Sequence, residues 1–150
     1  MRTTAKADYA VRAAVELAAA GGLVTAEQIA QAQGIPANFL ENILRDLRRA
    51  GIVDSRRGQQ GGYVLARPAE EISIADVIRA VEGPLANVRG HSPDALEYPG
   101  SAEKLRDVWV ALRAGVRSVL ERVSLADVAS GELPPFVAEL TRDADAWVRR

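Results

Sequence analysis

The residues best suited to chemistry lie between positions 36 and 62, and their types favour binding to nucleic acid. A predicted helix over 36–50 presents polar side chains outward, among them Asn38, Glu41, Asn42, Arg45 and Arg49. Asn can pair with adenine, Glu can accept a hydrogen bond from cytosine, and Arg binds guanine or phosphate. The same pattern also fits the solvated face of an ordinary amphipathic helix, so its context must decide.

A second polar group follows directly, in the basic and glycine-rich connection over 54–62. Its residues of interest are Arg56, Arg57, Gly58 and Gly61. Glycine lets a backbone approach a ligand closely, and arginines at a hairpin tip can enter a minor groove or hold phosphates. A plain surface hairpin is the simpler alternative. A nucleotide-binding loop is disfavoured because neither GxxxxGK[ST] nor a strand-to-helix GxGxxG occurs here.

Three short helices are predicted to position these groups. Asp8 can cap a first helix with Val11, Ala14, Val15 and Ala18 facing inward, ending at Gly21-Gly22. A capping box over 25–28 begins a second helix that ends at Gly34. Pro36 then starts the third helix, whose predicted inward face is Phe39, Leu40, Ile43, Leu44 and Leu47. The tight turn between the second and third helices predicts a helix-turn-helix.

The rest of the chain predicts a wing and a long helix. Short strands at 52–53 and 63–65 flank the basic connection and form a hairpin. Ser73 caps a fourth helix that ends at Gly83, and 84–100 is expected to be an irregular loop. A helix over 102–123 carries an apolar stripe that needs a cover: Leu105, Val108, Trp109, Leu112, Val116, Val119 and Leu120.

The expected organisation is a mainly α protein with a winged helix-turn-helix domain over 1–83 and a loop over 84–100. The long helix and a short following helix would occupy 101–130, and a tail 131–150. The tail has a loosely amphipathic pattern, which fits either packing on a dimer or disorder. A role as an interaction surface is the less favoured alternative.

Composition narrows the function. The chain of 150 residues has a net charge of -1, but 1–67 holds nine Lys or Arg against six Asp or Glu, whereas 68–150 holds ten against fourteen. The basic excess therefore coincides with the predicted DNA-binding part. Arginine far outnumbers lysine, which suits phosphate and guanine contacts, although coding bias of the genome would have the same effect.

The absence of cysteine excludes disulfides and thiolate chemistry, and there is one histidine. We therefore predict neither an enzyme nor a metal site, and no cofactor. Neither a leader nor an apolar stretch of membrane-spanning length is visible. A cytoplasmic protein without a membrane partner is expected.

Two segments carry a resemblance to a known family: Phe39-Leu-Glu-Asn-Ile-Leu-Arg-Asp-Leu-Arg-Arg-Ala-Gly-Ile-Val53 and Ser55-Arg-Arg-Gly-Gln-Gln-Gly-Gly-Tyr-Val-Leu-Ala66. They resemble the IscR/NsrR/CymR regulators of the Rrf-two family, and the resemblance covers roughly residues 1–130. It implies a homodimer in which the apolar stripe of the long helix is the dimerisation surface, palindromic double-stranded DNA read by the third helix, and a wing in the adjacent minor groove. Glu41 falls where the family has its sequence-discriminating glutamate, and Arg57 where it has its wing arginine.

The chain departs from the family in the loop before the long helix. Cluster-binding members hold an iron-sulfur centre there with three cysteines, whereas this loop has none. Asp8 matches a position that supplies an oxygen ligand in a similar member, but without thiolates a helix cap is the simpler role. We expect a transcription regulator, more often a repressor in this family, that works without a cluster.

The effector is left open by the sequence. Tyr9, His91, Tyr98 and Trp109 could border a small-molecule pocket, or the aromatic residues could simply belong to the core. His91, near Asp94 and Glu97, could sense pH or a metal, although a lone loop histidine is usually solvated. Control by a partner protein, and a winged-helix module that binds protein instead of DNA, are the competing interpretations. The arginine-rich face favours DNA over the second of these.

Overall fold

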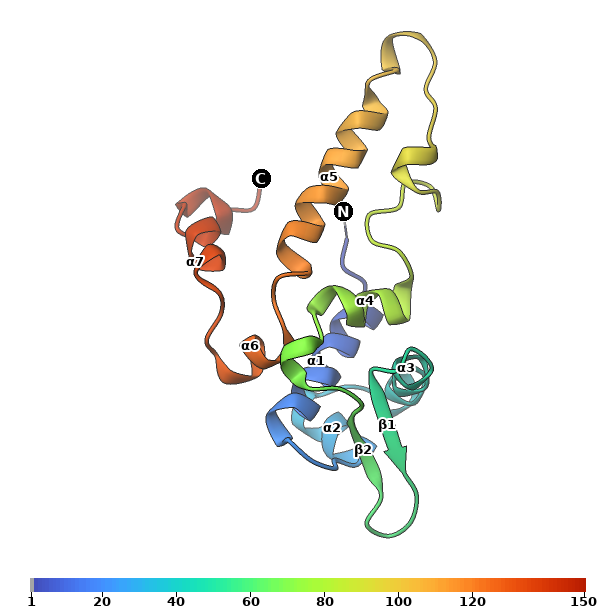
Figure 1. Cartoon of the computed structure of the whole chain (residues 1–150), viewed down its shortest axis with the longest axis vertical. Coiled ribbons are helices and arrows are strands. Elements are labelled where there is room, and N and C mark those ends of the chain that lie inside the picture. Colours follow the sequence, from blue (N-terminus) through green and yellow to red (C-terminus); the bar gives the residue numbers. More distant parts are fainter. Residues whose placement is uncertain (1) are drawn as a thin grey trace.

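The computed structural model describes residues 2–150 and shows a helical domain with a two-stranded wing at one end. A long helix and a C-terminal tail extend from the other end (Figure 1). The fold is mainly α, as predicted. The α-helices are α1 (Ala5–Ala20), α2 (Ala26–Gln33), α3 (Ala37–Arg49), α4 (Ile74–Glu82), α5 (Leu105–Leu120), α6 (Leu125–Ser130) and α7 (Pro135–Thr141). The strands are β1 (Val53–Arg56) and β2 (Gly62–Leu65), and 3-10 turns are η1 (Ala69–Glu71), η2 (Pro93–Ala95), η3 (Gly100–Ala102) and η4 (Ala144–Trp147).

Helix α1 forms the centre of the core and packs against α2, α3, α4 and α6 (Figure 1). Its N-cap is Thr4, whose hydroxyl accepts a hydrogen bond from the Ala7 amide at 3.0 Å. The prediction of Asp8 as the cap is therefore wrong: Asp8 lies in the first turn and pairs with Arg12. The predicted inward face is shifted too, since the fully buried residues are Ala7, Ala10, Ala13, Ala14 and Leu17.

The helix-turn-helix is built as predicted. Thr25 and Gln28 form a reciprocal capping box at the start of α2, and Gly34 ends it in the left-handed conformation with φ 61°. Pro36 is the N-cap of α3, one residue before its predicted place. Leu40, Ile43, Leu44 and Leu47 are buried. Phe39 was also predicted to face inward but is 48% exposed, because it lies at the edge of the apolar face and contacts the Tyr9 ring.

The wing is an antiparallel hairpin in which Val53 pairs with Leu65 and Arg56 with Gly62. Strand β1 starts one residue later than predicted, since the Ile52 amide still donates to the Leu47 carbonyl of α3 at 2.9 Å. The backbone amide of Tyr63 donates to the Val24 carbonyl at 2.7 Å, and the Val24 amide donates back at 2.9 Å. These two bonds attach strand β2 of the wing to the segment between α1 and α2.

A junction joins the winged domain to the end of α5. Ser73 with Asp76 and Ser124 with Asp127 form the capping boxes of α4 and α6. The two serines form an antiparallel bridge. Two flanking backbone bonds strengthen it, from the Ile74 amide to the Val123 carbonyl and from the Leu125 amide to the Ile72 carbonyl, both 2.9 Å. The end of α5 is thus fixed to α4.

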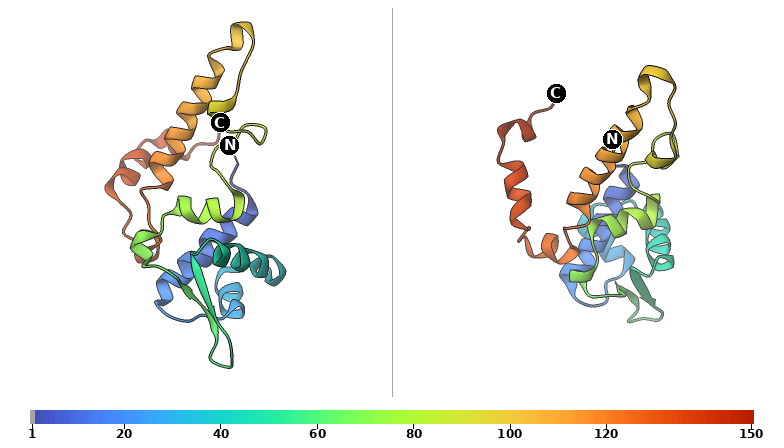
Figure 2. Two further views of the ribbon diagram at one scale, coloured as in Figure 1. Left: turned by 45° about the vertical axis from the view of Figure 1, so that its right-hand side comes forward. Right: turned by 45° about the horizontal axis from the view of Figure 1, so that its top comes forward.

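Helix α5 is shorter at both ends than the predicted 102–123 helix. The preceding residues form the 3-10 turn η3, and the chain leaves the helix after Leu120 to reach the junction. The region 84–100 is irregular as predicted, apart from η2 and the start of η3. The tail, for which packing and disorder were both open, forms α7 and η4 and extends away from α6 on one side of α5 (Figure 2). No helix within residues 2–150 has the length and apolarity that a membrane span requires.

Candidate nucleic-acid interface

The outer face of α3 is polar and open to solvent. Asn38, Glu41, Asn42, Arg45 and Arg49 are all exposed, as the sequence predicted. Opposite them the buried leucines and isoleucine hold the helix against α1, so this face points away from the core. A helix presented in this way can enter a major groove with several side chains at the base edges.

Hydrogen bonds along α3 order part of this face. The Asn42 amide nitrogen donates to the Asn38 carbonyl at 3.4 Å, and its amide oxygen accepts from Arg45 at 3.1 Å. The Arg48 guanidinium donates to the Ser55 hydroxyl on β1 at 3.1 Å. The last bond links the helix to the wing, so both parts would meet DNA as one unit.

The tip of the wing requires glycine. Gly58 has φ 104°, a conformation that residues with a Cβ rarely adopt. A Cβ on Gly61 would lie 2.4 Å from the Arg56 carbonyl oxygen and 2.8 Å from that of Gly58. The turn therefore closes tightly, and Arg56 and Arg57 remain exposed on it.

The interface carries an unbalanced positive charge. Arg45, Arg48, Arg49, Arg56 and Arg57 are exposed, and none of them forms an ion pair within residues 2–150. Polyanions neutralise such groups with release of counterions, which makes binding favourable and dependent on salt. The arrangement thus suits a phosphate backbone better than a neutral partner.

Three contacts from α1 fix the position of the helix-turn-helix. The Lys6 ammonium pairs with Asp46 of α3 at 2.8 Å. Arg12 donates to the Gln33 backbone carbonyl at the end of α2, and the Gln33 side-chain amide donates to Glu16 at 2.7 Å. Because all three contacts join α1 to another helix, they restrain the angle at which α3 is presented.

A cleft between α3 and the wing adds residues that were not included in the predicted interface. It is lined by Glu41, Leu44, Arg45, Arg48, Arg49 and Tyr63, with a volume of about 480 Å³. Tyr63 was predicted as a strand residue only, and Arg48 as an outward side chain without a specific role. The alternation of β2 was the available signal, since it turns one side of a short strand toward the neighbouring helix.

Comparison with known proteins decides the family. Residues 3–131 match the Rrf2 family, which is described as an iron-dependent transcriptional regulator. The chain belongs to the Rrf2 family. The helix-turn-helix (HTH) regulator CymR of Bacillus subtilis is 35% identical over 132 residues, which are 87% of this chain and 91% of CymR. A Mycobacterium tuberculosis protein, provisionally named as an HTH-type transcriptional regulator, is 56% identical over 145 residues, 95% of this chain and 90% of that protein.

Solved structures agree. The structure of B. subtilis CymR, called the global cysteine regulator in that organism, superposes with a TM-score of 0.73 and 33% identity over 87% of this chain and 97% of CymR. The structure of IscR from T. potens superposes with a TM-score of 0.69 and 30% identity, over 100% of this chain and 93% of IscR. The predicted family and winged fold are confirmed. Rrf2 proteins are transcription regulators and not enzymes, and they typically bind DNA as dimers.

The residues of this Rrf2 protein do not fit the iron that the family description implies. The chain has no cysteine to supply thiolates. Within residues 2–150 no three His, Asp or Glu side chains come together in a way that could hold a metal ion. Asp94, the nearest carboxylate to His91 in the sequence, is bonded to Ser92 and Arg113. The hydrogen bonds from Ser92 and Arg113 lower the pKa of this exposed carboxyl from 3.8 to about 2.

The four residues considered for an effector pocket lie in three separate settings. The Trp109 indole donates to the Tyr98 hydroxyl at 3.0 Å, so this pair is brought together. Tyr9 instead packs edge-on against Phe39 of α3, with 6.1 Å between ring centroids, and lies under the Arg12 guanidinium. His91 is exposed and forms a backbone bridge with Val88.

Proposed function

We propose that this Rrf2 protein is a homodimeric, sequence-specific regulator that binds palindromic operators without an iron-sulfur cluster. Helix α3 would read base edges in the major groove through Asn38, Glu41 and Asn42, while the wing places Arg57 in the adjacent minor groove. The observation that carries this proposal is the group of exposed, unpaired arginines shared by α3 and the wing. The Arg48–Ser55 bond supports joint docking of the two elements.

The apolar side of α5 supports the dimer. None of its residues is fully buried, and Val108 and Leu112 are 56% and 42% exposed. A groove of about 560 Å³ between α1, α4 and α5 is lined mainly by apolar side chains, including Val11, Ile78 and Val116. Leaving such a surface in water is unfavourable, and the second copy's α5 is the occupant we assign to it.

Repression is the outcome we propose for DNA binding. A dimer that covers two half-sites on one face of a promoter would exclude polymerase from the same DNA. An effector would act by changing the separation of the two winged domains, which the junction at Ser73 and Ser124 links to α5.

The decisive experiment is selection of genomic DNA fragments by the purified protein at physiological salt with competitor DNA, read by sequencing. We expect an enriched palindromic motif. A double variant, Arg45→Ala with Arg57→Ala, should lose this enrichment. The matched control is Arg89→Ala, which alters an exposed loop arginine and should retain the enrichment. Sequence-blind or absent enrichment by the unaltered chain would refute the proposal.

A further inference from the structure

The C-terminal tail over 131–150 is folded but leaves several large apolar side chains in water. Leu140, Trp147 and Val148 are 58%, 76% and 57% exposed. The Trp147 indole N–H donates to the Thr141 carbonyl at 2.7 Å, which folds η4 back on α7. The indole is therefore held in one place by its polar end while its ring remains uncovered, as expected of a surface prepared for a partner.

The tail has a fixed attachment. Phe136 and Val137 pack against the core, and the Arg122 guanidinium lies 3.9 Å from the Phe136 ring centroid. Arg122 lies two residues after the end of α5, so this contact links the start of α7 to the end of the long helix. Figure 1 shows α7 beside α5, on the side away from the 84–100 segment.

We propose that the tail clasps α5 of the second copy in the homodimer. The charges favour this occupant: α5 carries Arg106, Arg113 and Arg117 against Asp107, whereas the tail over 131–150 carries Glu132, Glu139, Asp143 and Asp145 against Arg142, Arg149 and Arg150. Arg117 and Glu139 have no ion-pair partner within residues 2–150. Half-buried Val110 and exposed Ala114 lie on the same side of α5 as Arg117 and outside the stripe assigned to the α5 contact, so they offer apolar surface to the tail.

This inference rests on the proposed homodimer and adds a second contact to it. The family match ends at residue 131, so the dimer contact shared across the family lies before the tail. The clasp is continuous with that contact because both use α5. It would bury Leu140 and Trp147 against the partner and place Glu139 near a basic helix, which strengthens association without changing the DNA interface.

Cross-linking between copies tests the clasp, and the absence of native cysteine makes it unambiguous. One copy carries Leu140→Cys, and a differently tagged copy carries Arg117→Cys. The mixed dimers are treated with a short bismaleimide. The control partner carries Leu23→Cys, which lies exposed in the loop after α1. Sedimentation of the same samples reports the oligomeric state.

We expect a cross-link between copies from residue 140 to residue 117 and none to residue 23. A dimer without this cross-link would overturn the clasp and leave the homodimer standing. The same conclusion would follow if a chain carrying both cysteines formed the cross-link only within itself. A monomer would overturn the homodimer and the clasp together. Independently, Trp147→Ser should weaken self-association about tenfold, while Leu23→Ser should not.

Discussion

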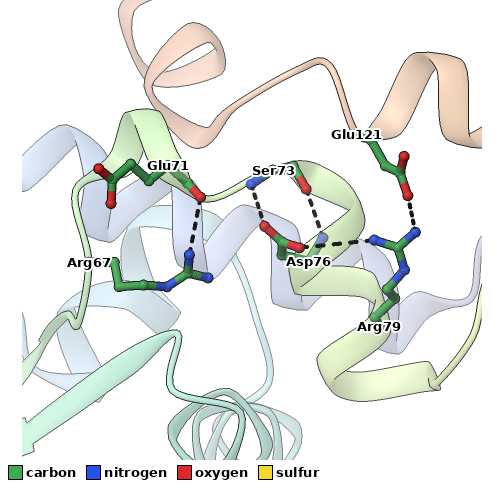
Figure 3. A network of polar contacts seen from close by, with 6 residues as sticks. All are labelled: Arg67, Glu71, Ser73, Asp76, Arg79 and Glu121. Atoms are coloured by element: carbon green, nitrogen blue, oxygen red, sulfur yellow. Dashed lines mark hydrogen bonds and ion pairs between the residues drawn. The ribbon is translucent and has the colours of Figure 1, made fainter.

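The guanidinium of Arg79 on α4 forms an ion pair with the carboxylate of Glu121, the residue that follows α5 (Figure 3). Arg79 also lies 4.0 Å from Asp76, which closes the capping box of α4 with Ser73. The figure shows these residues in one row across the junction. One arginine thus connects the start of a helix in the winged domain with the end of the helix assigned to the dimer.

Glu121→Gln is expected to separate stability from DNA binding. Both partners are partly exposed, so the loss should lower the free energy of unfolding by less than about 1 kcal/mol. Affinity for a palindrome should fall several-fold, because the two winged domains lose a fixed spacing, while affinity for a single half-site stays the same. Anisotropy on both DNAs measures this difference. Asp107→Asn, which removes an exposed pair within α5, is the control. Equal losses on both DNAs would contradict the coupling role.

Arg57→Ala should weaken binding to every DNA sequence. The exposed wing arginine would neutralise a phosphate or lie in a minor groove. Its removal should therefore make the fall of log K with log salt less steep, by about one in slope. Titrations at several salt concentrations check the slope, with Arg89→Ala as the control. An unchanged slope would remove Arg57 from the interface.

Glu41→Ala should change which bases are preferred. A carboxylate that accepts from cytosine provides discrimination of about 1–3 kcal/mol at one position in each half-site. Its loss should not weaken binding to unrelated DNA, since a negative charge leaves the phosphate-facing surface. Selection from random DNA by both proteins would reveal the difference, with Glu70→Ala, outside α3 and the wing, as the matched variant. If both proteins selected the same motif, Glu41 would have no part in base recognition.

Leu112→Asp should dissociate the dimer. Symmetry would place two carboxylates in or near one apolar contact, which should weaken self-association by at least about 100-fold. Sedimentation and circular dichroism together separate loss of assembly from loss of fold. Leu23→Asp, at a similarly exposed leucine outside α5, should remain dimeric. A folded dimer of Leu112→Asp would show that the contact lies elsewhere.

Asp94 should titrate with a pKa of about 2, below its ordinary value of 3.8, because Ser92 and Arg113 bond to the charged carboxylate. Since the folded pKa is the lower one, this contribution to stability is complete above pH 3.8 and is lost as the pH falls through about 2. Carboxyl carbon shifts in a pH titration measure it. Ser92→Ala and Arg113→Gln should each raise the pKa, and Ser118→Ala should not.

Local signals predicted most of the winged domain. The capping box at Thr25 and Gln28, the left-handed glycine at Gly34 and the apolar spacing of α3 each depend on neighbouring residues alone, so they are visible in the sequence. The start of α1 was missed because Thr4 and Asp8 are both good caps. Its inward face was misassigned since, in an alanine-rich helix, valines do not mark the buried side; Val11 and Val15 are half-buried beside fully buried alanines.

The rest depends on contacts between distant segments. The polar residues of α3 and the wing could be named from their pattern, but not the Arg48–Ser55 bond or the cleft that includes Tyr63. Tyr9, Tyr98 and Trp109 are all aromatic, but their spacing in the sequence does not show whether they line one pocket or lie in separate places. The order of the tail comes from the Trp147–Thr141 bond and the Arg122–Phe136 contact, which no local rule predicts.

The bridge between Ser73 and Ser124 makes α5 a rigid arm of the winged domain. The helix has sixteen residues and its far end projects beyond the winged domain beside the 84–100 segment (Figure 1). At about 1.5 Å per residue this arm is about 24 Å long, so a displacement of its tip by about 2 Å turns the whole unit by about 5°. In the proposed dimer, a ligand that shifts the tip by this distance would turn the DNA-binding face of each copy by the same angle relative to its half-site.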